Sequence, residues 1–280
     1  MKRSQLAKET VEIVKKGSYN AGAKSVSIVR QVRDCLKQTQ YFSPEDLDQL
    51  LSDILSLSPR VQATTIEVQN ETTLQGAKRL ALSGQFEKVT ALNFASAKNP
   101  GGGFLSGSQA QEESLARSSA LYASLCKARP YYDYHRSNRS SLYSHRMILS
   151  PECPVIREDN GTLLEEPYCI SFITSAAPNA AALIQKQEFE QMESIPTIFR
   201  ERALRVLAIA QHHNTDALIL GAWGCGVFRN DAEMVAQIFS KLIGPGGEFE
   251  NRFQHILFSV LDKAPSQPTF TAFSQAFQTA

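Results

Sequence analysis

Cysteine is scarce in this 280-residue sequence, and its five cysteines are scattered and odd in number, without a C-x-x-C pair. This pattern offers neither a disulfide framework nor a zinc site, and it indicates reduced thiols in a cytoplasmic protein. No uninterrupted apolar run approaches the ~20 residues of a membrane span, and the N-terminus lacks the apolar core of a signal peptide. We therefore expect a soluble, cytoplasmic protein without a membrane partner. The cysteines are Cys35, Cys126, Cys153, Cys169 and Cys225.

An excess of charge of either sign is also missing. Lysine and arginine number 29 against 28 aspartates and glutamates, which leaves a net charge of +1. Such a balance gives no electrostatic reason to expect direct binding of DNA or RNA. The adjacent His212 and His213 have no further ligands at a suitable spacing, so we expect no metal and no other cofactor.

Two kinds of hydrophobic pattern alternate along the chain and predict an α/β fold. After a helix-rich first third, strand-like runs alternate with helical patterns, which favours a mixed, largely parallel central sheet covered on both faces. The expected helices span residues 4–16, 23–37, 43–57, 72–82, 112–128, 197–212 and 231–243. The expected strands span residues 64–68, 88–94, 168–174, 216–221 and 254–260.

Three consecutive glycines, Gly101 to Gly103, follow one of these strands in the loop from Asn99 to Ser108. Glycine lacks a Cβ, so such a run lets the backbone take positive φ values and lie close to a ligand. The adjacent carboxylates of Glu112 and Glu113 supply a candidate general acid or base beside the loop. Ligands of open α/β sheets bind beyond the carboxyl ends of the strands. The stretch therefore predicts a phosphate- or sugar-shaped ligand between the loop and the carboxylates.

A second glycine loop, Ala222 to Phe228, also follows a predicted strand and precedes a predicted helix. Asn230 is the expected N-cap of that helix, with Glu233 three residues further on. Two such junctions offer backbone N–H groups and helix N-termini, which suit a diphosphate.

The first motif also has a purely structural interpretation. Ser108 and Gln111 match a helix capping box, and Glu112 and Glu113 would lie in the first turn, where carboxylates favour the helix dipole. Glu113 and Arg117 are spaced for a surface ion pair. The second loop weakens this interpretation, because a capped helix alone does not explain two similar junctions.

The same residues carry a resemblance. Gly-Gly-Gly, a spacer of seven residues and then Gln-Glu-Glu resembles the signature of bacterial-type poly(ADP-ribose) glycohydrolases, which are macrodomains with an added N-terminal segment. Phe172 to Asn179 (FITSAAPN) and Gly221 to Asn230 (GAWGCGVFRN) are similar to the same family, in the expected order. The resemblance implies a macrodomain-like, three-layer α/β/α catalytic domain over residues 61–280. It also implies a helical N-terminal extension packed on this core over residues 1–60.

The implied activity is hydrolysis of the ribose–ribose O-glycosidic bonds of poly(ADP-ribose) with release of ADP-ribose, and the implied partners include ADP-ribosylated proteins. By this resemblance, Glu113 protonates the leaving group and then activates water, while Glu112 holds the ribose on the leaving side. The remaining residues expected to bind substrate are Asn99, Gly101, Gly102, Gly103, Gln111, Gly224, Cys225, Gly226, Val227 and Phe228. Two alternatives stay open: a macrodomain that binds ADP-ribose without cleaving it, and a hydrolase of mono-ADP-ribosylated targets.

A segment rich in aromatic and basic residues lies between residues 131 and 146. Such a mixture can stack bases and bind phosphates, so a contact with the polymer is one interpretation. A solvated insertion that lies over the core is the other. The residues are Tyr131, Tyr132, Tyr134, His135, Arg136, Arg139, Tyr143, His145 and Arg146.

Overall fold

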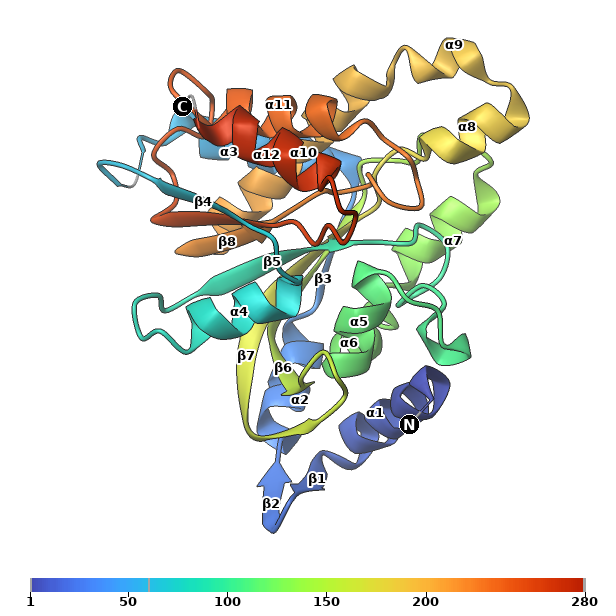
Figure 1. Ribbon diagram of the computed structural model, residues 1–280, viewed down its shortest axis with the longest axis vertical. Helices are drawn as coiled ribbons and strands as arrows, with labels where there is room; N and C mark the ends of the chain where they lie inside the picture. The colour runs from blue at the N-terminus through green and yellow to red at the C-terminus, as the bar shows by residue number, and fades with distance from the viewer. Residues whose placement is uncertain (1, 60, 279–280) are drawn as a thin grey trace.

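The computed structural model describes residues 2–59 and 61–278 and contains a seven-stranded mixed sheet (Figure 1). Five neighbouring strands run parallel, and two further strands extend the sheet at one side, each paired antiparallel with its inner neighbour. The expected α/β class with a mixed, largely parallel sheet is therefore confirmed. In spatial order the strands are β3 (Gln40–Phe42), β6 (Met147–Arg157), β7 (Leu163–Ser175), β5 (Val89–Phe94), β8 (Ala217–Leu220), β9 (His255–Ser259) and β4 (Thr65–Gln69).

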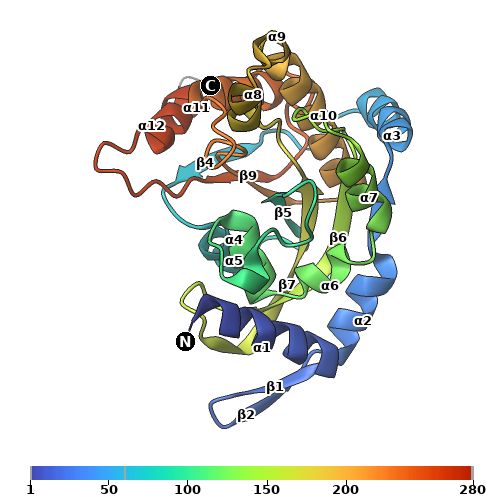
Figure 2. The ribbon, with the colours of Figure 1, turned by 90° about the vertical axis from the view of Figure 1, so that its right-hand side faces the viewer.

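Helices cover both faces of the sheet, as Figure 2 shows. Along β5, Ala91 points into one hydrophobic core and Leu92 into the other, because successive strand residues face opposite sides. One core packs under α1 (Arg3–Lys16), α2 (Val29–Gln38), α4 (Thr73–Ala81), α5 (Gln111–Ser118), α6 (Leu121–Leu125) and α7 (Arg129–Ser137). The other packs under α3 (Pro44–Ser56), α10 (Ile195–His212), α11 (Ala232–Ile243) and α12 (Pro268–Gln278).

The N-terminal segment is less helical than expected. A hairpin of β1 (Ser18–Ala21) and β2 (Lys24–Ser27) occupies the start of the helix predicted over 23–37, and α2 begins only at Val29. The turn between the two strands contains Gly22 at φ +58°, a value that suits glycine. Because β3 also pairs with β6 of the main sheet, the segment shares that sheet. The division at residue 60 stays a prediction.

Two further predictions were wrong in detail. The helix expected over 112–128 is split into α5 and α6, because Ser119 bridges to Val155 and the Ala120 amide donates to Pro154 O at 3.1 Å. The eleven-residue strand β6 was not predicted, since its sequence contains two prolines, which ordinarily disfavour an interior strand. A register shift between Ser150 and Cys153 accommodates Pro151.

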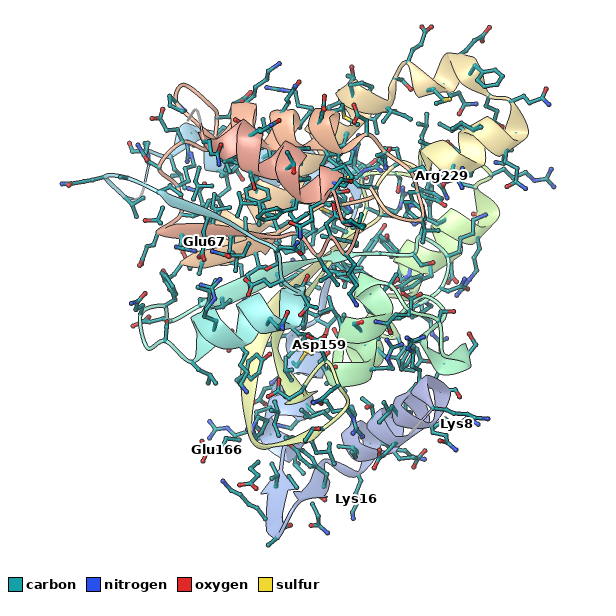
Figure 3. All side chains as sticks on the ribbon, viewed as in Figure 1. Lys8, Lys16, Glu67, Asp159, Glu166 and Arg229 are labelled. Carbon is teal, nitrogen blue, oxygen red and sulfur yellow. The ribbon has the colours of Figure 1, made fainter. Side chains whose placement is uncertain are left out.

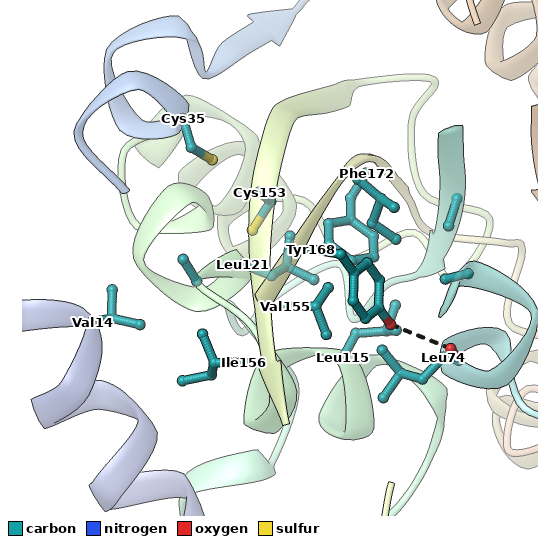
Figure 4. Packing of buried hydrophobic residues seen from close by; sticks show 14 of the residues in the cluster. Val14, Cys35, Leu74, Leu115, Leu121, Cys153, Val155, Ile156, Tyr168 and Phe172 are labelled. Atoms are coloured by element: carbon teal, nitrogen blue, oxygen red, sulfur yellow. Dashed lines mark hydrogen bonds between the residues drawn. The ribbon is translucent and has the colours of Figure 1, made fainter. Parts of the chain in front are cut away.

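The core between the N-terminal helices and the sheet is formed around β6 and β7 (Figure 4). Val155 and Phe172 are fully buried there, and the Tyr168 hydroxyl donates to Leu74 O at 3.3 Å, which ties β7 to α4. Within the described residues, no helix is long and apolar enough to cross a membrane.

The helix α1 packs against the back of the first glycine loop. A small cluster joins Ala7 of α1 to Phe104, in the short helix η1 (Phe104–Ser106), and to Ala116 of α5. The buried Thr10 hydroxyl donates to Arg117 O at 2.6 Å. The N-terminal segment therefore supports the loop that sequence analysis placed at the site. Two other short helices, α8 (Ala180–Lys186) and α9 (Phe189–Met192), lead from β7 to α10 and were not predicted.

Candidate active site

A cleft of about 780 Å³ lies at the carboxyl edge of the parallel strands. Residues that follow β4, β5, β7, β8 and β9 all line it, because parallel strands end at the same edge of the sheet. The second glycine loop, Ala222 to Phe228, therefore lines the same cleft as Gln109 to Leu115, the residues that follow the first glycine loop. The lining includes Glu71 to Leu74, Phe94 to Ser96, Gln109 to Leu115, Asp159, Ala177, Ala222 to Phe228, Ser259 to Leu261, Lys263 and Thr269.

Glu112 lies at the floor of the cleft and is only 2 % exposed. Its carboxylate accepts hydrogen bonds from the Ser96 amide at 2.6 Å and from Asn93 Nδ2 at 3.2 Å. The pKa of Glu112 is raised to about 8, chiefly by burial and also by the nearby Glu113 carboxylate, against the lowering effect of these hydrogen bonds. Glu112 is therefore held in one place and binds its proton more tightly than an ordinary carboxyl does.

Asn93 is a residue of this site that sequence analysis missed. It is fully buried on β5, and its Nδ2 also donates to Thr174 Oγ1 at 3.1 Å, while its Oδ1 has no partner among the described residues. Asparagine inside a strand of apolar neighbours was the available signal, because a buried amide requires partners.

Glu113 lines the same cleft and is only partly buried. Its Oε1 accepts a hydrogen bond from the Gly103 amide at 3.0 Å, so the glycine loop fixes this carboxylate as well. Gly102 has φ +59°, and a Cβ at this position would overlap Glu113 Oε1. The triple glycine thus allows the loop to close over the carboxylate pair.

The capping box of the purely structural interpretation does not form. The N-cap of α5 is Ala110, without a side-chain cap. Gln111 instead accepts a hydrogen bond from the Phe94 amide at 2.9 Å and donates to Leu92 O at 2.8 Å, which ties α5 to the end of β5. The expected pair between Glu113 and Arg117 is also wrong, because the buried Arg117 donates to Ser108 O at 2.7 Å.

The second loop contributes seven consecutive residues, Ala222 to Phe228, to the cleft wall. A Cβ at Gly226 would meet no atom within 4 Å, and Gly226 and Val227 are exposed at the mouth. Burial raises the pKa of the Cys225 thiol to about 12, so this cysteine is not a thiolate nucleophile.

The helix that follows the second loop begins one residue later than expected. Its N-cap is Asp231, whose Oδ1 accepts a hydrogen bond from the Glu233 amide at 3.1 Å. The predicted cap, Asn230, is buried and donates through Nδ2 to Pro178 O at 2.8 Å and to Gly224 O at 3.0 Å. The asparagine therefore closes the loop on itself and links it to the segment that follows β7.

Part of the aromatic and basic segment is an inner support of the site. Tyr131, Tyr132 and His135 are buried on α7, so the solvated-insertion interpretation is wrong for them. The Tyr143 ring lies 6.0 Å from the Phe228 ring, measured between centroids. The fully buried Arg202 donates to Leu142 O and Ala176 O, which holds this segment against α10.

The remaining predicted residues belong to the first glycine loop. Asn99 is exposed and, like Gly101 to Gly103, lies beside the cleft rather than in its lining. The far end of the cleft was not predicted. Its residues include Thr72, whose hydroxyl donates a hydrogen bond of 2.5 Å to Asp159.

In the part of the chain that the structure describes, no cluster of three or more metal-ligating side chains occurs. The roles predicted for single residues stay predictions.

Comparison with known proteins identifies the family. Residues 7–158 match the catalytic domain of microbial-type PARG. A poly(ADP-ribose) glycohydrolase from Thermomonospora curvata is 46% identical, with a TM-score of 0.93 over 98% of this chain and 99% of that one. The same enzyme bound to the inhibitor ADP-HPD gives a TM-score of 0.91 at 46% identity, again over 98% of this chain and 99% of that one.

A glycohydrolase from Deinococcus radiodurans in complex with ADP-ribose is 42% identical, with a TM-score of 0.82 over 91% of this chain and 99% of that one. Among curated proteins there is no match. These likenesses confirm the macrodomain-like fold. The chain belongs to the microbial-type poly(ADP-ribose) glycohydrolase family.

Proposed function

We propose that this protein binds the end of a poly(ADP-ribose) chain in the cleft and hydrolyses its ribose–ribose O-glycosidic bond, releasing ADP-ribose. The observation that carries the proposal is the meeting of two fixed carboxylates with a glycine loop in one cleft. Family membership supports it, because the T. curvata and D. radiodurans relatives are poly(ADP-ribose) glycohydrolases. ADP-ribosylated proteins are the corresponding partners, and five free thiols support a place in the reducing cytoplasm.

In this proposal, Glu113 is the acid and base. Cleavage of a glycosidic bond needs a proton on the leaving oxygen, stabilisation of an oxocarbenium-like ribose and attack by water. The partly exposed position of Glu113 supports a role that exchanges protons with water and substrate. The Gly103 amide holds its carboxylate in one orientation, which supplies the positioning that such a proton transfer needs.

Glu112 positions the substrate. A carboxyl whose pKa is raised to about 8 is neutral at pH 7, so it donates a hydrogen bond to a ribose hydroxyl without repelling the phosphates of the substrate. Asn93 and the Ser96 amide fix its orientation. The two adjacent glutamates thereby have different tasks, because one is buried and the other reaches water.

The second loop binds the diphosphate. Its exposed Gly226 leaves the backbone open to an approaching phosphate, and amide N–H groups are good partners for phosphate oxygens. Phe228 would pack on the terminal ribose, with Tyr143 behind it.

The test is to incubate the purified protein with poly(ADP-ribose) and to separate the products. We expect free ADP-ribose as the product, released in proportion to enzyme and time. A protein that binds ADP-ribose but releases none from the polymer would instead be a reader of the modification. Release only from mono-ADP-ribosylated proteins would replace the proposed substrate.

A further inference from the structure

Four segments of the chain share an unusual charge composition. Residues 96–103, 134–146, 179–187 and 226–230 together contain six lysines or arginines and no aspartate or glutamate, while Asp133, Glu188 and Asp231 stand directly at their borders. The whole chain, by contrast, carries 29 basic and 28 acidic residues. The six cations are Lys98, Arg136, Arg139, Arg146, Lys186 and Arg229.

The fold brings these four segments together. Arg136 Nε donates to Lys98 O at 3.0 Å, which joins α7 to the first glycine loop. Lys186 Nζ donates to Arg139 O at 3.0 Å, which joins α8 to the segment after α7. The Ala181 amide donates to Phe228 O at 2.9 Å, so the start of α8 contacts the second glycine loop. Figure 3 shows Arg229 between α7 and α8.

Three of these six cations are fully available to a ligand. Lys98, Arg139 and Arg229 are exposed, and none of them forms an ion pair within residues 2–59 and 61–278. Arg136 forms one ion pair, in which its Nη1 lies 3.1 Å from Asp133 Oδ1. Arg146 is already occupied, since its guanidinium lies 3.3 Å from the centre of the Tyr134 ring. We call Lys98, Arg136, Arg139, Lys186 and Arg229 the cationic rim.

The rim borders the cleft on the side of the two glycine loops. Lys98 directly precedes Asn99 in the loop that holds Glu113, and Arg229 directly follows Phe228. At the other end the lining contains the carboxylates of Glu71 and Asp159, with Lys263 as the cation beside them. Asp159 and Arg229 lie well apart in Figure 3. A polyanion that leaves the cleft is therefore attracted at the end with the two glutamates.

Given the proposed function, on which this inference rests, we propose that the cationic rim binds phosphates of the poly(ADP-ribose) chain on the leaving side of the scissile bond. The oxygen released on cleavage belongs to the adenosine ribose of the adjoining unit, and that unit carries its own diphosphate. Lysine and arginine are the usual partners of such groups. The cleft then binds the terminal unit, and the rim distinguishes a polymer from free ADP-ribose.

The experiment compares two triple variants in the full chain, each in a Glu113→Gln background so that bound polymer stays intact. The rim variant carries Lys98→Gln, Arg139→Gln and Arg229→Gln. The control carries Lys8→Gln, Lys15→Gln and Lys16→Gln, which removes three exposed cations from α1. Lys8 and Lys16 lie far from Arg229 in Figure 3. Affinities for poly(ADP-ribose) of defined length, for ADP-ribose and for single-stranded RNA of equal charge are measured over a range of salt.

For the rim variant we expect the polymer affinity to fall at least about 10-fold at low salt, and the salt slope to become shallower by about 2, since each lost phosphate contact of a single strand removes about 0.7. Its affinity for ADP-ribose should match that of the background protein, and the control should match it in every assay. Equal polymer affinity and slope in the rim variant and the control would overturn the inference, as would an equal loss of ADP-ribose affinity. An RNA affinity above the polymer affinity, lost in the rim variant, would reassign the rim to nucleic acid.

The same proteins with Glu113 restored separate the two proposals. Loss of polymer cleavage in the rim variant, with ADP-ribose binding intact, supports the rim as part of the polymer site. A wild-type protein that captures polymer through the rim but releases no ADP-ribose would end the proposed hydrolase function while supporting the binding inference.

Discussion

The two glycine loops of the cleft use glycine for different reasons. In the first loop, the space beside Gly102 is filled by the protein's own Glu113 carboxylate. In the second loop, the space beside Gly226 is empty to at least 4 Å. The first loop thus allows a side chain to approach the reacting bond, whereas the second leaves room for a ligand. We expect substitutions in the first loop to change the rate and those in the second to change the affinity.

The largest effect should come from the carboxylate that the first loop holds. Glu113→Gln keeps size and polarity but removes the titrating proton, so turnover should fall by about 100- to 10,000-fold, the usual range for general acid–base catalysis. The dissociation constant of ADP-ribose, measured by calorimetry, should change by no more than a few-fold. Near-normal release of ADP-ribose would show that Glu113 is not the acid.

A slightly smaller loss of rate should follow from Gly102→Ala. The new Cβ must displace the Glu113 carboxylate, and the positive φ of +59° adds backbone strain. A displacement near 1 Å costs about 100-fold in rate, so kcat should fall by that order while ADP-ribose still binds. Gly226→Ala is the matched control and should retain turnover. If both alanine variants lose rate equally, the contrast between the loops is wrong.

A substitution in the second loop should weaken the affinity for ADP-ribose. The Cβ of Gly226→Val meets no protein atom within 4 Å and Gly226 is exposed, so the melting temperature should stay near that of the wild type. Its side chain would occupy the space through which phosphate reaches the amides. Loss of one charged hydrogen bond, at about 1.5–3 kcal/mol, corresponds to a roughly 10- to 100-fold weaker ADP-ribose affinity. Unchanged affinity in the folded variant would mean that this loop is only a turn.

The smallest effect concerns the proton on Glu112. The pKa of this carboxyl is about 8 in the folded state and near 4.3 in the unfolded state. The folded state therefore binds the proton more tightly, and this stabilisation is lost as the pH rises from about 4.3 to about 8. Between pH 5.5 and 7, the free energy of unfolding of the wild type relative to Glu112→Gln should fall by about 1.4 kcal/mol per pH unit. The comparison cancels the histidines, which titrate in both proteins. A difference that is constant with pH would contradict the protonated state.

The sequence predicted the positions of the elements that surround the cleft better than it predicted their contacts. Long periodic segments such as α10 and strands such as β5 were recovered because both faces of the sheet are buried in apolar side chains. The strand β6 was missed because it contains two prolines, and its pairing with β7 could not be inferred from its own sequence. Short helices such as α8 depend on tertiary contacts and carry little periodicity of their own.

The glutamate pair could be located from the motif, but its different environments could not. Consecutive residues of a helix point about 100° apart. Glu112 therefore contacts the buried Asn93, while Glu113 contacts the first glycine loop. Gln111 is a case in which the motif indicated the wrong contact. Its spacing from Ser108 is typical of a capping box, but its side chain binds the backbone of β5 instead. Long-range partners decide both outcomes.

The packing of α1 on the first glycine loop has a consequence for local unfolding. Ala7 and Phe104 share one small cluster, and Thr10 is bound to the backbone of α5. Opening of α1 would therefore also free η1, so these distant parts of the chain should form one cooperative unit in native-state hydrogen exchange. The amides of α1 and of the glycine loop should then exchange with a common free energy of opening, below that of the central strands.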